Sequence, residues 1–515
     1  MCHLDSIRYF VTDKSITLFW EKPDEVSKDV VYQVILDDKM VGKTKKTHYT
    51  VDELNADQAY TMRIEVWAKD SVVQKDCGVI RTSKSKKRKD ITLAPYYAAG
   101  DGVTLNTAVI QQAIDECGID DVLYIPAGTY LTGALRLHSD MEVYLEEGAV
   151  LQGTDRPEDY LPRIPSRFEG YEMECYSSLI NMGHLDKDSG YNCRNVMIHG
   201  KGSIVGGGLA LATNIVELER VYLQDMLKEL GEGIKEYETA DTIPGRVRGR
   251  LVNMSNCQNI ILSGIHFADG PCWNIHMIYS DNIVTHNCTV KSRGVWNGDG
   301  WDPDSSTNCT IFGTAFYTGD DAIAIKSGKN PEGNIINRPC EHIRIFDCIS
   351  KFGHGIAMGS EMSGGIRDVK IWDCDMGNTK YGIEIKGTKK RGSFVKDVQV
   401  RDCKVSRILF HSVGYNDDGI GAECPPLFAD CSFENLHILG EYLSMEDEVV
   451  TCDAFELIGF DEKGYEIQNV VFKDILMQRE VNDGVQSLSL QYCKNITLQN
   501  VEVREKAKKN EGNRK

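Results

Sequence analysis

Carboxylate side chains gather in one short stretch of the chain, at a spacing that favours acid–base chemistry. Asp299 and Asp302 lie in one segment, and the adjacent pair Asp320 and Asp321 follows it. Hydrolysis of a glycosidic bond needs one carboxyl group that holds a proton and a second, ionised one that activates water. Like charges brought together raise at least one pKa, so both protonation states can coexist near neutral pH. The stretch therefore predicts a hydrolytic acid–base site.

The composition is that of a globular protein with an acidic balance. The chain has 515 residues, of which 41% are hydrophobic and 26% charged, and its formal net charge is −19. This length suits a small domain followed by a large elongated one. The charge disfavours nucleic acid or an anionic membrane as a partner. No stretch approaches the ~18 apolar residues of a membrane span. The oligomeric state is left open.

The cysteines and the first residues favour a cytoplasmic location. The 17 cysteines are scattered without Cys-x-x-Cys pairs, so neither a disulfide framework nor a zinc site is indicated. We expect buried, reduced thiols. Residues 1–6 lack the basic start and apolar run of a signal peptide. Secretion stays open if a signal segment has been trimmed.

Residues 1–82 predict a small β-sandwich, because several short alternating strands occur in fewer than ninety residues. The expected strands are Ile16–Trp20, Tyr32–Leu36 and Tyr60–Ala68. Trp20, and the segment 54–60 ahead of the last strand, resemble a fibronectin type III domain. Residues 83–93, rich in lysine, predict a basic linker, and residues 504–515 a charged tail.

Residues 94–503 predict a solenoid of stacked coils. A polar residue followed by alternating apolar residues recurs, with starts at Asn195, Asn259, Asn282, Asn308, His342, Asp368, Asp397, Asn469 and Asn495. Successive starts from 259 to 397 differ by 23, 26, 34, 26 and 29 residues. Such periods in strand-forming sequence favour an all-β fold, a parallel β-helix, over a leucine-rich-repeat horseshoe. A helix from 107 to 117 is expected to cap the first coil, and 206–245 breaks the pattern as a helical insertion.

Coil stacking would bring distant polar residues into one row. Asp299 and Asp320 differ by 21 positions, Asp321 and His354 by 33, and His354 and Lys386 by 32, each about one coil. Neighbouring strands lie about 4.8 Å apart, so residues one coil apart can line one face. The spacing predicts a cleft lined by carboxylates, an imidazole and a cation.

Four ordered motifs in this row resemble glycoside hydrolase family 28, the polygalacturonase family. They are Asn297-Gly298-Asp299, Gly319-Asp320-Asp321, Gly353-His354-Gly355 and Ile383-Glu384-Ile385-Lys386. The resemblance runs from about residue 95 to 500. It implies a right-handed β-helix and an inverting hydrolase that attacks galacturonate-containing oligosaccharides from pectin, starting at one end. It implies no metal and no cofactor.

The resemblance also implies roles for individual residues. Asp320 would be the general acid, and Asp299 and Asp321 would hold and deprotonate the attacking water. The acid and base carboxyls would then lie about 6.5–9.5 Å apart. His354 would set the protonation of the acid. Lys386, with Asn297 and Glu384 as further binding residues, would bind a substrate carboxylate.

Glu384 stands where the family has an arginine, and this departure leaves the substrate open. A carboxylate there would repel galacturonate unless it turns away and Lys389, Lys390 or Arg391 substitutes. Otherwise a rhamnogalacturonan-type or substituted galacturonan is the substrate. A pectate-lyase-type enzyme needs a strong base, usually arginine, which the row lacks. A non-catalytic sugar-binding solenoid would bind but not turn over.

Overall fold

The computed structural model describes residues 7–23, 30–68, 71–231, 247–413, 419–479 and 488–505. The chain divides into two compact units, residues 1–87 and 88–515. The predicted tail at 504–515 lies outside the described residues apart from its first two positions.

The N-terminal unit is the predicted β-sandwich. One antiparallel sheet contains β1 (Arg8–Val11), β2 (Ile16–Phe19) and β5 (His48–Val51); the other contains β4 (Lys39–Thr44), β3 (Val31–Leu36), β6 (Ala59–Ala68) and β7 (Ser71–Arg81). Ile16 and Leu18 of one sheet and Val34 and Met62 of the other share one buried core. The fibronectin type III kinship of this unit stays a prediction.

The predicted linker at 83–93 differs from the structure in its second half. Residues Lys87–Asp90 form β8, which pairs with β10 (Asp121–Ile125) of the second unit. The guanidinium of Arg88 lies 4.5 Å from the ring centre of Tyr124. Lys89 Nζ lies 3.8 Å from Asp121 Oδ2. These basic side chains therefore have aromatic and acidic partners at the first coil.

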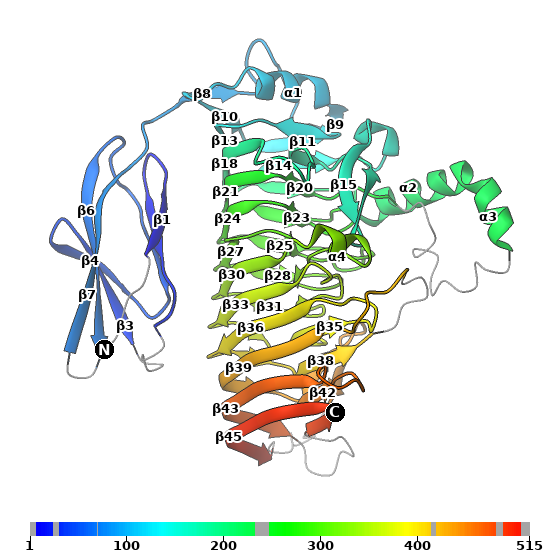
Figure 1. Ribbon diagram of the computed structural model, residues 1–515. Coiled ribbons are helices and arrows are strands. Elements are labelled where there is room, and N and C mark those ends of the chain that lie inside the picture. Colours follow the sequence, from blue (N-terminus) through cyan, green and yellow to red (C-terminus); the bar gives the residue numbers. More distant parts are fainter. Residues whose placement is uncertain are drawn as a thin grey trace, which may run out of the picture. The chain divides into compact units, whose positions relative to one another are not determined.

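The second unit is a right-handed parallel β-helix, whose coils are stacked in chain order in Figure 1. Its eleven-stranded sheet consists of β12 (Leu135–Leu137), β17 (Ile180–Gly183), β20 (Val252–Ser255), β23 (Ile275–Ile278), β26 (Trp301–Asp304), β29 (Ile323–Ile325), β32 (Ile356–Met358), β35 (Ile383–Gly387), β38 (Ile408–Ser412), β42 (Phe455–Ile458) and β44 (Leu488–Gln491).

The other long sheet supplies the remaining walls of the coils. It consists of β10, β11 (Gly128–Thr132), β13 (Met141–Leu145), β14 (Ala149–Gly153), β18 (Cys193–Gly200), β19 (Ser203–Val205), β21 (Cys257–Ser263), β22 (His266–Ala268), β24 (Asp281–His286), β25 (Thr289–Lys291), β27 (Thr310–Phe312), β28 (Ala315–Tyr317), β30 (Cys340–Phe346), β31 (Ile349–Ser350), β33 (Ile366–Trp372), β34 (Asp375–Met376), β36 (Phe394–Arg401), β37 (Lys404–Val405), β39 (Leu427–Ile438), β43 (Ile467–Arg479), β45 (Cys493–Glu505), β8 and β9 (Asp101–Leu105).

The repeated polar residue marks a backbone bend in each coil. Asn195, Asn259 and Asn282 have φ values of 55°, 59° and 54°, in the left-handed region that asparagine tolerates better than most residues. Their side chains form a ladder. Asn259 Nδ2 donates to Asn195 Oδ1 at 3.0 Å, and Asn282 Nδ2 donates to Asn259 Oδ1 at 2.8 Å. The sequence repeat therefore reports both the bend and the stacking that the bend allows.

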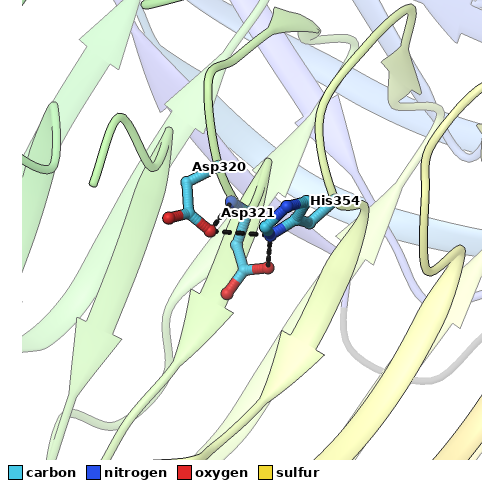
Figure 2. A group of neighbouring side chains, drawn as sticks. All are labelled: Asp320, Asp321 and His354. Carbon is cyan, nitrogen blue, oxygen red and sulfur yellow. Dashed lines mark hydrogen bonds and ion pairs between the residues drawn. The ribbon is translucent and has the colours of Figure 1, made fainter. Parts of the chain in front are cut away.

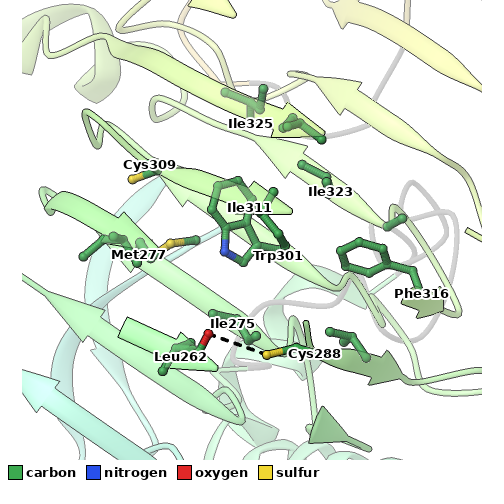
Figure 3. Close-up of a cluster of buried hydrophobic side chains, with 14 of the residues drawn as sticks. Leu262, Ile275, Met277, Cys288, Trp301, Cys309, Ile311, Phe316, Ile323 and Ile325 are labelled. Atoms are coloured by element: carbon green, nitrogen blue, oxygen red, sulfur yellow. Dashed lines mark hydrogen bonds between the residues drawn. The ribbon is translucent and has the colours of Figure 1, made fainter. Parts of the chain in front are cut away.

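Apolar side chains fill the interior between the sheets. Figure 3 shows Ile275, Met277, Trp301 and Ile323 pointing inward from successive strands of the eleven-stranded sheet, against Ile311 of the other sheet. Alternate residues of each strand therefore point outward. Among the described residues, no helix is long and apolar enough to cross a membrane.

The second unit also contains helices and short hairpins besides its two long sheets. Helix α1 (Thr107–Asp115) lies at the first coil and buries Ile110, Ala113 and Ile114, as predicted for a cap. The predicted insertion contains α2 (Gly208–Tyr222) and α3 (Gln224–Leu230), and residues 232–246 lie outside the described residues. The smaller elements are η1 (Pro157–Tyr160), the hairpin of β15 (Ile164–Phe168) and β16 (Tyr171–Cys175), α4 (Glu332–Ile336), and the hairpin of β40 (Glu441–Leu443) and β41 (Val449–Thr451).

Candidate active site

The predicted site residues lie at consecutive strands of the eleven-stranded sheet. Trp301, Ile323, Ile356 and Ile383 are register partners across β26, β29, β32 and β35. The sites at Asp299, Asp321 and His354 each precede their strand's register partner by two residues. The turns that enter these strands therefore present the three side chains at one edge of the sheet, with Lys386 on β35.

Asp320, Asp321 and His354 form one cluster (Figure 2). His354 Nδ1 lies 2.8 Å from Asp320 Oδ1 and 3.4 Å from Asp321 Oδ1. The side chains of Asp320 and His354 are 29% and 27% exposed, whereas that of Asp321 is 7% exposed. Burial would lower the pKa of His354, but the two aspartates raise it well above its usual value. Burial would likewise raise the pKa of Asp320, but His354 lowers it below its usual range. These opposite shifts favour a protonated imidazole beside an ionised Asp320.

Two glycines allow His354 to approach the aspartates. Gly353 and Gly355 have φ values of +97° and +105°, which side chains rarely adopt. A Cβ atom on Gly353 would lie 2.6 Å from the backbone oxygen of Asp320. The backbone amide of His354 donates to that same oxygen at 3.0 Å. The Gly-His-Gly motif is therefore required by close packing of two turns.

Asp299 belongs to a second, more deeply buried cluster. Lys326 Nζ donates to Asp299 Oδ2 at 3.3 Å and lies 2.9 Å from Asp302 Oδ2. All three side chains are at most 6% exposed. Burial raises the pKa of Asp302 to about 7 against the opposing effect of Lys326, and it raises that of Asp299 well above its usual value. Lys326 Nζ also lies 3.2 Å from the ring centre of Trp273.

Glu384 and Lys386 form a third group on the outer face of β35. Lys386 Nζ donates to Asp321 Oδ2 at 3.2 Å and lies 2.9 Å from Glu384 Oε2. His411 Nε2, from β38, lies 2.5 Å from Glu384 Oε1. Burial would raise the pKa of Glu384, but Lys386 and His411 lower it to about 2. A negative charge therefore sits where the family resemblance implied a positive one.

The turn that carries Asn297 and Asp299 is fixed from both sides. Arg248, which is buried, donates from Nη2 to Asn297 Oδ1 at 2.7 Å. A Cβ atom on Gly298 would lie 2.8 Å from the backbone oxygen of Ser292. The packing of this turn therefore leaves little room for a side chain at position 298.

The outer face of the sheet is covered on one side of the carboxylates. Arg167 of the hairpin β15–β16 donates from Nη1 to Asp304 Oδ1 at 2.6 Å, and His276 Nε2 lies 3.4 Å from Asp304 Oδ2. The outward-facing side chains of β20, β23 and β26 are buried; they are Asn253, Ser255, His276, Ile278, Asp302 and Asp304. Burial would raise the pKa of Asp304, but the paired Arg167 lowers it to about 2. The hairpin thus closes this end of the face.

The cluster in Figure 2 also has the donor set of a cation site. One ligand atom each from Asp320, Asp321 and His354 lie within 4.8 Å of one another. Lys386 already contacts Asp321, and a bound cation would have to share that carboxylate with its ammonium group.

The sequence did not single out Lys326, Asp304, Arg248 or His411. Lys326 lies five residues after Asp321 and two residues after the outward-facing Ala324, so strand alternation alone could have pointed to it. The other three depend on contacts with distant elements. For Asp304 the partner is Arg167, 137 residues away, and no local pattern reports such a contact.

A β-helix that presents paired carboxylates, an imidazole and lysines on one outer face is the architecture of a glycosidase. Residues 189–414 match the family model described as glycosyl hydrolases family 28. The matched region contains all four motifs of the row, and the chain is a glycoside hydrolase.

Individual relatives agree with this assignment. The chain is 25% identical over 548 residues to the exo-poly-α-D-galacturonosidase of Dickeya chrysanthemi, covering 95% of this chain and 89% of that one. It is 32% identical over 323 residues to a probable polygalacturonase of Vitis vinifera, covering 60% of this chain and 59% of that one. The structure of a family 28 exopolygalacturonase from Yersinia enterocolitica aligns with a TM-score of 0.77 at 23% identity, covering 98% of this chain and 99% of that one.

Proposed function

We propose that this glycosidase releases galacturonate from one end of pectin-derived oligogalacturonates by hydrolysis with inversion. The observation that carries the proposal is the row of Asp299, Asp320, Asp321, His354 and Lys386 on adjacent strands, in which two carboxylates contact lysines and one contacts an imidazole.

Asp320 is the proposed general acid, working together with His354. As the more exposed of the two adjacent aspartates, Asp320 can reach a glycosidic oxygen. Its proton is held in the resting protein by His354, 2.8 Å away. When the glycosidic C–O bond breaks, the proton shared by Asp320 and His354 passes to the leaving oxygen. The net charge of these two side chains then falls by one. Water later restores the proton.

Asp299 and Asp321 are the proposed holders of the attacking water. Water adds its oxygen to the anomeric carbon from the face opposite the leaving group, and its proton passes to a carboxylate. Lys326 and Lys386 each place a positive charge beside one of these two carboxyls, at 3.3 and 3.2 Å. At Asp299 the charge of Lys326 opposes the effect of burial, which raises the pKa of that carboxyl.

Attack from one end is supported by the covered part of the sheet. The hairpin β15–β16 contacts Asn253 of β20 and Asp304 of β26, and the outward residues of β20, β23 and β26 are buried. The insertion that holds α2 and α3 connects β19 to β20, and residues 292–300 connect β25 to β26. Both segments run from the long sheet to the eleven-stranded sheet, so they leave the coil at the same corner. A chain bound at the carboxylates would thus meet a wall on that side. The relatives from Dickeya and Yersinia carry exo-acting names.

Product analysis tests this proposal. Digestion of oligogalacturonates followed by mass spectrometry should yield galacturonate as the small product from the first time point. Early fragments that are longer than the monomer but shorter than the substrate by more than one residue would refute end-wise attack, and an unsaturated product would identify a lyase. The variant Asp320→Asn should retain oligogalacturonate binding and lose turnover by a factor of about 10²–10⁴. Rhamnogalacturonan oligomers tested in parallel check the alternative substrate.

A further inference from the structure

Glu384 is buried behind Lys386 and is not presented to a ligand. Its side chain is 2% exposed, whereas those of Lys386 and His411 are 13% and 22% exposed. Each of its two carboxylate oxygens faces one nitrogen atom: Oε2 faces Lys386 Nζ at 2.9 Å and Oε1 faces His411 Nε2 at 2.5 Å. A substrate carboxylate would therefore meet Lys386 before it met Glu384.

The three cations that sequence reasoning offered as substitutes for the family's arginine are engaged elsewhere. Lys389 Nζ lies 3.5 Å from Glu462 Oε2, and Lys390 Nζ donates to the backbone oxygen of Gly419 at 3.0 Å. Arg391 is buried. It donates from Nε to the backbone oxygen of Ser360 at 2.7 Å and from Nη1 to Asn330 Oδ1 at 2.5 Å. None of these three cations therefore takes the position of the family's arginine beside Lys386.

The same arrangement of charges occurs twice in the site. Lys326 lies between Asp299 and the buried Asp302, at 3.3 and 2.9 Å. Lys386 lies between Asp321 and the buried Glu384, at 3.2 and 2.9 Å. Asp302 and Glu384 occupy the same register position, with Ala324 and Ala357 between them on β29 and β32. In both cases a buried carboxylate holds a lysine against a carboxylate proposed to bind water.

We propose that Glu384, supported by His411, is a positioning residue that holds the ammonium group of Lys386 against Asp321. This inference rests on the proposed function, in which Asp321 helps to hold the attacking water. Two carboxylates share the charge of Lys386, so that lysine contributes chiefly to the reacting geometry and less to capture of a substrate carboxylate. Loss of Glu384 should therefore lower kcat more than it changes KM.

The test compares Glu384→Gln, which keeps the shape of the side chain, with Glu456→Gln as a matched control. Glu456 lies two strands further along at the same register position, since Glu384 pairs with Leu409 and Leu409 with Glu456. It has its own cation, Arg407, at 3.5 Å. We expect Glu384→Gln to lower kcat on oligogalacturonates about 100-fold with KM changed less than about 3-fold. His411→Gln should act in the same direction, and Glu456→Gln should change neither constant.

A second readout does not depend on the substrate. Lys386 acylation by acetic anhydride, measured by mass spectrometry relative to the exposed Lys389, should increase in Glu384→Gln because its ammonium is released. A lower KM with kcat retained would overturn the proposal, because Glu384 would then act on the substrate. Unchanged kcat and unchanged acylation would also overturn it. If wild-type protein fails to cleave oligogalacturonates, the proposed substrate is refuted, and the acylation result alone decides the role of Glu384.

Discussion

Replacement of Lys326 by methionine should destabilise the β-helix in a pH-dependent way. The substitution keeps most of the side-chain volume and removes one positive charge from between Asp299 and Asp302, which lie 3.3 and 2.9 Å from Nζ. Removal of one partner of a buried ion pair leaves an uncompensated charge and costs about 3–5 kcal/mol. That full cost applies only where the aspartates are ionised.

The direction of the pH effect follows from the raised carboxyl pKa values. An unfolded aspartate titrates near pH ~3.9, whereas the pKa of Asp302 in the folded protein is about 7 and that of Asp299 also lies well above its usual value. A raised folded-state pKa gives stability that is present below the unfolded pKa and is lost as pH rises through the folded one. Without Lys326 both folded-state values rise further. The stability difference between wild type and variant should thus be small near pH 4 and approach the full cost above pH 7.

Urea denaturation followed by circular dichroism at pH 4.5, 6 and 8 measures this difference. Lys389→Met is the matched control, because Lys389 is 67% exposed and its substitution should change the midpoint little at any pH. A destabilisation by Lys326→Met that is equal at all three pH values would refute the reasoning, as would a variant more stable than wild type at pH 8.

Two further substitutions test the turns and the proton donor. Gly298→Thr should destabilise the protein by about 1–3 kcal/mol and reduce activity, because its Cβ would lie 2.8 Å from the backbone oxygen of Ser292. Thermal unfolding measures this loss, with Gly190→Ala as the control, because a Cβ atom at Gly190 meets open space. His354→Gln should lower kcat about 10²–10⁴-fold and move the alkaline limb of the pH–rate profile toward lower pH, because the proton would then reside on the Asp320 carboxyl and no longer on the imidazole, whose pKa the aspartates raise. An unchanged profile would exclude the imidazole as the proton store.

The coil architecture could be predicted from sequence because each coil repeats a local conformational requirement. Asn195, Asn259 and Asn282 adopt left-handed φ values, so asparagine recurs at the interval of one coil. That interval also sets the row of Asp299, Asp321 and His354. Residues at one register position on adjacent strands come together whatever lies in the intervening loops.

The charges around the row could not be predicted, since they depend on elements outside the repeat. Arg167 reaches Asp304 from a hairpin inserted more than a hundred residues earlier. Glu384 was expected either to turn away or to repel a substrate. Its burial between Lys386 and His411 follows from the registration of β35 against β38. The close packing of Gly298 against the backbone oxygen of Ser292 likewise depends on the fold of its turn, which no local pattern reports.

Proton NMR of the first product tests the proposed reaction most directly. Inversion at the anomeric carbon of an α-linked galacturonide releases the product as β-galacturonic acid. Mutarotation to the α anomer follows only later. We predict that the β anomer of galacturonate appears first when wild-type protein acts on an oligogalacturonate, and that Asp320→Asn produces none on the same time scale. Initial release of the α anomer would contradict inversion, and initial products other than galacturonate and the substrate shortened by one residue would contradict end-wise attack.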